Sequence, residues 1–361
     1  MRPFVLFEPI SSRYICPEGA SRDECYPTHY LRSLSEIVTV TVMRYRPRHG
    51  HSEIDRRLIG KAVATLVATF SGATSLSVLS DPAGASTTHQ VLHVVAAENF
   101  WGNIASQLGG HDVSVTSLIT NPNADPHLFE TDATDAAKLA QARVVIENGA
   151  GYDGWMASLL SADSGQSTVV NAGSVFHVTG SDPNPHLWYD IPKVPKMAAA
   201  ITAALIKADP EDSSAFQHNL KRFDASLAPL TAMLAKIKRN FAGAPVAYTE
   251  RVPGYALAVA HLSVKTPPGF ARAIEDGEDP GPADTLSMER LLTKHSIDVL
   301  LYNVQTVTPV TTQIRSLAET SGVPVVGVSE TMPLSDRTYQ EWQLSQLTAL
   351  LNALREAKSK P

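Results

Sequence analysis

The chain has 361 residues, of which 43% are hydrophobic and 18% are charged, and its formal net charge at pH 7 is −6. The length suggests about two domains, and the composition is typical of globular proteins with an apolar core. The negative charge, together with the lack of a basic stripe in the sequence, argues against a nucleic-acid partner.

The first 85 residues differ from the rest of the chain. Residues 1–42 show no amphipathic period and contain both cysteines, so we interpret them as a non-native extension or a disordered segment. From Met43 onward, arginines precede a mildly apolar run at 58–79 and the small residues 83–85. This order is typical of a cleaved export signal. We therefore predict a signal at 43–85, cleavage near Ala85 and a periplasmic mature protein.

The apolar run at 58–79 has two other interpretations. A membrane anchor is disfavoured because the run contains Lys61 and many Ser, Thr and Gly residues. Arg56 and Arg57 resemble a twin-arginine export signal, although Asp55 stands where Ser or Thr is usual. The general and twin-arginine export routes both stay open. No cysteine follows the run, which argues against a lipid anchor, and we expect no stable membrane insertion after the signal is removed.

From residue 86 onward, short apolar runs alternate with amphipathic segments. The runs predict buried strands at 91–97, 113–119, 143–147 and 169–170. The amphipathic segments predict helices at 99–108, 134–142, 152–160 and 191–208. Together they predict an N-terminal α/β lobe over residues 86–208.

Residues 209–241 are predicted to form one long helix that joins two lobes. Apolar residues recur there at alternating steps of four and three and form a single stripe: Phe216, Leu220, Phe223, Leu227, Leu230, Leu234, Ile237 and Phe241. Asp209 is the expected N-cap, with Pro210 as the first helical residue. Pro229 lies within the stripe, and we expect it to kink the helix without ending it.

The alternation of strands and helices restarts after residue 241. It predicts strands at 246–249, 297–302 and 323–328, and helices at 255–261, 310–321 and 339–357. Residues 266–284 are rich in Pro, Gly and acidic residues and are predicted to be a loop, followed by a helix that ends at 295. The pattern predicts a C-terminal lobe at 242–361 and an α/β fold of two lobes with parallel sheets.

Four polar side chains follow the predicted strands: His127 and His186 in the first lobe, and Glu250 and Glu330 in the second. Ligands of open α/β sheets bind beyond the carboxyl ends of the strands, so we expect these side chains to meet between the lobes. Two imidazoles and two carboxylates form a complete ligand set for a divalent transition metal. Alternatively, each histidine belongs to an ordinary tight turn.

Three further polar residues are assigned supporting roles. Asn303 and Gln305 follow a predicted strand and are expected to orient the two carboxylates. Asp182 lies in the loop before His186 and is expected to stabilise its own turn.

Five segments resemble the periplasmic metal-binding proteins of zinc and manganese ABC importers. They are NPNADPHLFETDATD (121–135), VVIENGAGYDGWM (144–156), DPNPHLWYDIP (182–192), VAYTERVPGYAL (246–257) and VPVVGVSETMP (323–333). The resemblance covers about residues 91–354. It implies two α/β lobes joined by a backbone helix, a metal site between them, and delivery of the ion to a membrane permease.

The resemblance also implies a ligand set: His127, His186, Glu250 and Glu330. Glu330 stands where the family usually has aspartate, and the histidine-rich acidic loop of many zinc carriers is missing from the sequence. Two carboxylates favour manganese or ferrous iron, whereas the general affinity order favours zinc. The choice between zinc and manganese therefore stays open. We expect a monomer that carries one ion.

A zinc-dependent hydrolase is the main alternative function. Two histidines and one glutamate with an open position also describe a catalytic zinc site, with Glu330 as general base. However, a fourth protein ligand leaves no place for a reactive water, and the sequence contains no HExxH pair, nucleophile elbow or phosphate loop. A module that binds organic solutes is a third possibility. We therefore predict a metal-binding protein that is not an enzyme.

Overall fold

The computed structural model describes residues 14–15, 26–27, 91–121, 129–162, 165 and 167–359. The chain divides into two compact units, Met1–Ala83 and Gly84–Pro361. In the first unit, strands β1 (Tyr14–Ile15) and β2 (Tyr26–Pro27) pair in antiparallel orientation. The predicted export signal at 43–85 lies outside the described residues.

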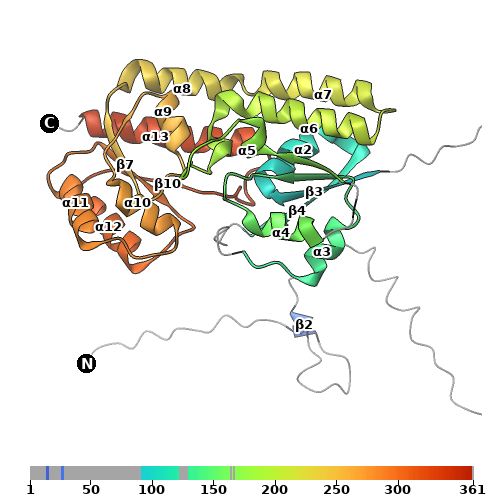
Figure 1. The fold of residues 1–361 in the computed structure, drawn as a ribbon. Helices are drawn as coiled ribbons and strands as arrows, with labels where there is room; N and C mark the ends of the chain where they lie inside the picture. Colours follow the sequence, from blue (N-terminus) through green and yellow to red (C-terminus); the bar gives the residue numbers. More distant parts are fainter. Residues whose placement is uncertain are drawn as a thin grey trace, which may run out of the picture. The chain divides into compact units, whose positions relative to one another are not determined.

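The first lobe of the second unit is built on a parallel sheet with the strand order β4-β3-β5-β6. Its strands are β3 (Leu92–Glu98), β4 (Val113–Ile119), β5 (Val144–Glu147) and β6 (Thr168–Asn171). Helices α2 (Asn99–Gly109) and α6 (Val194–Ala208) cover one face, and α3 (Ala133–Leu139) and α4 (Gly154–Ala162) cover the other (Figure 1). The short elements are η3 (Gly110–Asp112), α5 (Ala172–Val175), η5 (Leu187–Tyr189) and η6 (Ile191–Lys193).

The side chains of β3 show why a continuous apolar run forms this strand. Val94 and Ala96 join the core beneath α2 and α6, whereas Val95 and Ala97 join the core beneath α3 and α4. Successive strand residues point to opposite faces of a sheet, so a strand covered on both faces must be apolar throughout.

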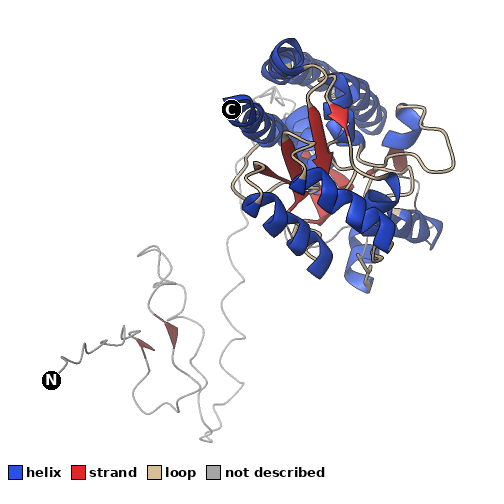
Figure 2. Cartoon of the chain, turned by 90° about the vertical axis from the view of Figure 1, so that its left-hand side faces the viewer, coloured by secondary structure: helices blue, strands red, loops and turns tan. Residues whose placement is uncertain are grey.

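The second lobe contains a parallel sheet with the order β10-β9-β7-β8. Its strands are β7 (Pro245–Tyr248), β8 (Ser263–Val264), β9 (Val299–Asn303) and β10 (Val325–Val328). Helices α10 (Pro268–Glu275), α11 (Pro282–Thr293) and α12 (Pro309–Thr320) pack on one face, and α9 (Gly254–Val259) and α13 (Tyr339–Ser359) on the other. Figure 2 shows strands enclosed between helices. The predicted α/β fold with two parallel sheets is therefore confirmed.

The prediction of one uninterrupted helix at 209–241 is wrong. The segment forms two helices, α7 (Ser213–Ser226) and α8 (Ala228–Phe241), on either side of Leu227. Pro229 lies in the first turn of α8, where it has no N–H to donate to the preceding turn, so the hydrogen-bond ladder is interrupted. The start is also later than predicted, because Asp209 is the C-cap of α6.

The apolar stripe of this segment nevertheless faces the core along both helices. Its buried members are Phe216, Phe223, Leu227, Leu230, Leu234 and Ile237. Helix α7 contacts α2 and α6 of the first lobe, whereas α8 contacts α9 and α13 of the second (Figure 1). The two helices thus pack on both lobes, although the boundaries assigned to the lobes from sequence stay predictions.

The prediction of a loop over residues 266–284 is also wrong, because this segment contains α10 and the start of α11. Pro268 is the first residue of α10, where a missing N–H is tolerated. Phe270 and Ile274 lie one helical turn apart and are buried against the second sheet.

No helix in the described part of the chain is both long enough and apolar enough to span a bilayer.

Candidate metal site

Glu250 and Glu330 each lie two residues beyond a strand of the second sheet, β7 and β10 respectively. Strand β9 runs between those strands and ends at Asn303, which is in register with Val328. The three polar side chains therefore reach the same edge of the sheet. They are almost fully buried, with exposed fractions of 2% for Glu250 and 0% for Glu330 and Asn303.

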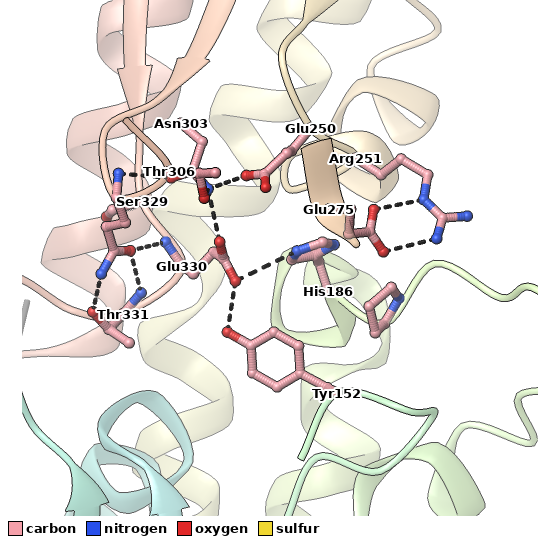
Figure 3. Close-up of polar contacts among 12 residues, drawn as sticks. Tyr152, His186, Glu250, Arg251, Glu275, Asn303, Thr306, Ser329, Glu330 and Thr331 are labelled. Atoms are coloured by element: carbon pink, nitrogen blue, oxygen red, sulfur yellow. Dashed lines mark hydrogen bonds and ion pairs between the residues drawn. The ribbon is translucent and has the colours of Figure 1, made fainter. Parts of the chain in front are cut away.

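The Asn303 amide joins the two carboxylates. Its Nδ2 donates to Oε1 of Glu330 at 2.7 Å and also donates to Oε2 of Glu250 (Figure 3). Its Oδ1 accepts from the backbone N–H of Gln305 at 3.0 Å, which fixes the orientation of the amide. Because an amide nitrogen only donates, Asn303 partly offsets the negative charge of both carboxylates. These contacts fit the orienting role predicted for Asn303.

Gln305 acts on the backbone instead of on a carboxylate. Its Oε1 accepts from the backbone N–H groups of Glu330 and Thr331, the latter at 2.9 Å. Its Nε2 donates to Oγ1 of Thr331 at 2.6 Å. Gln305 therefore holds the turn after β10 that carries Glu330.

His186 enters from the loop that precedes η5 in the first lobe, and its side chain is fully buried. Its Nδ1 lies 2.7 Å from Oδ1 of Asn184, and its backbone N–H donates to the same oxygen at 3.0 Å. The Asn184 Nδ2 donates to the backbone carbonyl of Arg251 at 2.8 Å, which settles which end of the amide is oxygen. Because that oxygen only accepts, Nδ1 of neutral His186 carries the proton and Nε2 keeps its lone pair.

Tyr152 brings the first lobe into contact with Glu330. Its hydroxyl donates to Oε2 of Glu330 at 2.8 Å, and the same oxygen lies 3.7 Å from Nε2 of His186 (Figure 3). The His186 ring also packs edge-on against Tyr152 and Trp188, with ring centroids 5.9 and 5.3 Å away. The Nε2 atom of His186 thus lies beside a carboxylate from the opposite lobe.

The structure brings together three of the four predicted ligands. His186 and Glu330 are neighbours, and Asn303 links Glu250 to Glu330. The fourth, His127, lies outside the described residues. Within the described ranges, no three His, Cys, Asp or Glu side chains are arranged so that they hold a metal ion by themselves. The complete ligand set therefore stays a prediction.

Sequence reasoning did not identify Tyr152 and Asn184 as site residues. Tyr152 lies just before α4 and was predicted as part of that helix. Asn184 lies two residues before His186 and its side-chain oxygen contacts Nδ1 of the His186 ring. An asparagine so close to a candidate ligand histidine is the sequence signal that could have identified it, because second partners commonly orient such imidazoles.

The chemistry of these donors suits a divalent cation. Burying two carboxylates side by side costs free energy unless positive charge offsets them. An imidazole nitrogen with a lone pair lies beside one of the carboxylates, and this combination of donors binds manganese, iron and zinc.

Comparisons with known proteins give a family match over most of the chain. Residues 94–353 match the profile described as "ZnuA: Zinc-uptake complex component A periplasmic". The manganese-binding lipoprotein MntA of Bacillus subtilis is 32% identical over 180 residues, which are 46% of this chain and 56% of that protein. A putative metal-binding protein of Treponema pallidum is 26% identical over 228 residues, 57% of this chain and 70% of that protein. The chain thus spans little more than half the length of the first of these relatives.

Solved structures share the fold. The binding protein FpvC of P. aeruginosa, in complex with Ni²⁺, superposes with a TM-score of 0.64 at 20% identity, covering 75% of this chain and 100% of that chain. The periplasmic zinc-binding protein TroA of Treponema pallidum gives a TM-score of 0.63 at 19% identity, covering 73% and 99%. Both likenesses confirm the fold of two α/β lobes.

Proposed function

The chain belongs to the family of periplasmic A components of zinc-uptake complexes, and we propose that it captures one divalent transition-metal ion for an ABC importer. The family match confirms the resemblance that the sequence segments indicated. The family and the relatives named above are binding proteins of transport systems and not enzymes, so the expected class is confirmed and the hydrolase alternative has no support.

The contact between the lobes at Glu330 is the observation that carries the proposal. His186 from the first lobe and Glu330 from the second meet there, and Asn303 brings Glu250 alongside. We propose these three residues as ligands, with His127 as the fourth. Ligands drawn from two lobes make the affinity depend on how closely the lobes approach, which gives a permease a way to release the ion.

The identity of the ion is part of the proposal. Relatives are named for manganese and iron, and the similar structures include zinc-binding and nickel-bound proteins. For this chain we propose zinc or manganese, because two imidazoles and two carboxylates accept both. We further propose that the protein works in the periplasm as a monomer after its export signal is removed.

Metal content tests the proposal. The protein, purified without chelator and then offered equal zinc and manganese, is expected to hold close to one ion per chain in native mass spectrometry. His127→Ala and His186→Ala should each weaken binding by about 100-fold or more, since even changes to groups that only orient ligands cost about 10–100-fold.

His218→Ala is the matched control, because His218 is exposed on α7. It should leave the metal content unchanged. Wild-type protein without stoichiometric metal would overturn the proposal, whereas full affinity in one His→Ala variant would remove only that residue from the ligand set.

A further inference from the structure

Arg251 follows the proposed ligand Glu250 and forms a two-pronged ion pair within the second lobe. Its Nε donates to Oε2 of Glu275 and its Nη2 to Oε1, both at 2.7 Å (Figure 3). The side chains of Arg251 and Glu275 are only 17% and 5% exposed. Bidentate pairs of this kind are the strong, geometrically specific form of the interaction. The guanidinium is therefore held in one orientation.

The same guanidinium reaches across to the first lobe. Its Nη2 also donates to Oδ1 of Asp182 at 2.9 Å, and Arg272 pairs with that oxygen as well. Asp182 lies in the loop that leads to His186. Asp182, which was expected to stabilise its own turn, thus also pairs with two arginines of the second lobe.

The loop is tied to Arg251 a second time through Asn184. The Asn184 Nδ2 donates to the backbone carbonyl of Arg251 at 2.8 Å. The Tyr255 hydroxyl donates to the backbone carbonyl of Asn184 at 2.9 Å. The side-chain oxygen of Asn184 is the group that fixes the His186 ring. One loop thus connects the residue after Glu250 with the imidazole that faces Glu330.

We propose that Arg251 is a positioning residue of an interlobe clamp, formed by Asp182, Asn184, Arg251 and Glu275, that slows release of the bound ion. This inference rests on the proposed function. The ion leaves when the ligands of the two lobes separate, and the clamp opposes that separation. Its loss should therefore change the dissociation rate more than the association rate.

The contact of the clamp that joins the two lobes is accessible to solvent. A cavity of about 420 Å³ between the lobes is lined by Asp182, Arg251, Arg272 and Glu275, and the Asp182 side chain is 48% exposed. Solvent and salt therefore screen the Asp182–Arg251 contact, whereas the more deeply buried Arg251–Glu275 pair is screened less. Screening should make release of the ion faster as the ionic strength rises.

Asp182→Asn is the first test, because it removes the charge that crosses between the lobes and leaves the Arg251–Glu275 pair intact. The full chain is loaded with Zn²⁺ or Mn²⁺ and mixed with excess chelator, and tryptophan fluorescence follows release, since Trp188 lies beside His186. We expect release about threefold faster than in wild type, in line with a partly exposed ion pair. Raising the salt from about 0.05 to 0.5 M should accelerate wild type but scarcely change the variant.

Two further variants separate the clamp from general effects of charge. Glu319→Gln removes one carboxylate from an exposed Arg315–Glu319 pair and should release the ion at the wild-type rate. Arg251→Gln should accelerate release by about tenfold. Adding Asp182→Asn to it should have a smaller effect than the same change in wild type, because the Asp182–Arg251 contact is already lost and only the Asp182–Arg272 pair is left to break.

Hydrogen exchange of the metal-free protein reports on the clamp without the ion. Backbone amides at 182–187 should exchange faster in Asp182→Asn than in wild type. Wild type that binds no metal would defeat the proposed function, yet exchange would still test the clamp. Metal-binding protein in which Asp182→Asn changes neither exchange, release nor salt dependence would overturn the clamp.

Discussion

Asn303→Asp is expected to destabilise the metal-free protein by about 4 kcal/mol, because it creates a third buried carboxylate beside two others. Asn303 is fully buried, and its amide nitrogen donates to Glu250 and Glu330. Aspartate at the same position removes the donor and turns an attraction into repulsion at both contacts. Urea unfolding of the metal-free protein measures the loss.

The bound ion should reverse much of this loss. A divalent cation offsets the third charge, so the gain in stability on adding zinc or manganese should be larger in Asn303→Asp than in wild type. Asn352→Asp is the control, because Asn352 is exposed on α13 and the same substitution there should stay within about 0.5 kcal/mol. Equal stability of Asn303→Asp and wild type without metal would contradict the charge assignment of this site.

The sequence was most informative where one local rule decides the structure. Continuous apolar runs located the buried strands, since β3 and β9 are covered on both faces. The rule that ligands gather beyond strand ends then placed Glu250 and Glu330 at one sheet edge, as observed. The first inference needs only the apolar runs themselves, and the second needs only that the strands of the sheet are parallel.

The sequence was misleading where the local structure depends on a single backbone group or on a residue far away in the chain. The spacing of the apolar stripe stays regular across α7 and α8, so it does not reveal that Pro229 lacks the N–H needed to continue the helix. The composition of 266–284 concealed α10, whose buried apolar residues are only Phe270, Ala271 and Ile274. The orientation of His186 depends on Asn184, whose own amide is fixed by a carbonyl 67 residues away.

Glu98 is a buried acid whose ionisation opposes folding. It ends β3, it is fully buried, and its carboxyl oxygens accept no hydrogen bond within the described part of the chain. Burial above all, and then the charge of nearby Asp153, raise the pKa of Glu98 well above its usual value. Asp153 is itself buried and accepts from the backbone N–H groups of Asn148 and Gly149 at 2.6 and 2.7 Å. Protonated Glu98 therefore donates to charged Asp153.

The sign of the resulting pH dependence follows from the direction of this shift. Below the usual glutamate pKa of about 4.3, Glu98 is protonated in both the folded and the unfolded chain. Above it, the unfolded chain releases the proton while the folded chain keeps it, so stability falls by up to about 1.4 kcal/mol per pH unit. The decline ends at the raised pKa of the folded state. Glu147, whose pKa burial also raises, adds a slope of the same sign.

Glu98→Gln is accordingly expected to stabilise the protein at neutral pH. The glutamine amide is neutral at every pH and still donates to Asp153, so the variant should match wild type near pH 4 and become increasingly more stable than wild type as the pH rises toward 7. Urea unfolding at several pH values measures the difference. Glu278→Gln, at an exposed residue, should show no such trend.

The test also reaches the proposed metal site, because Asp153 holds the turn that carries Tyr152, and Tyr152 donates to Glu330. A protonated Glu98 keeps Asp153 paired and this turn in place, whereas ionised Glu98 repels Asp153. Glu98→Gln should therefore slow hydrogen exchange at residues 148–153 at pH values above the raised pKa of Glu98 and leave it unchanged at pH 5. A stability difference that does not vary with pH would mean that Glu98 ionises as readily in the folded protein as in the unfolded chain. Exchange that is insensitive to the substitution at every pH would mean that the Glu98–Asp153 pair does not hold this turn.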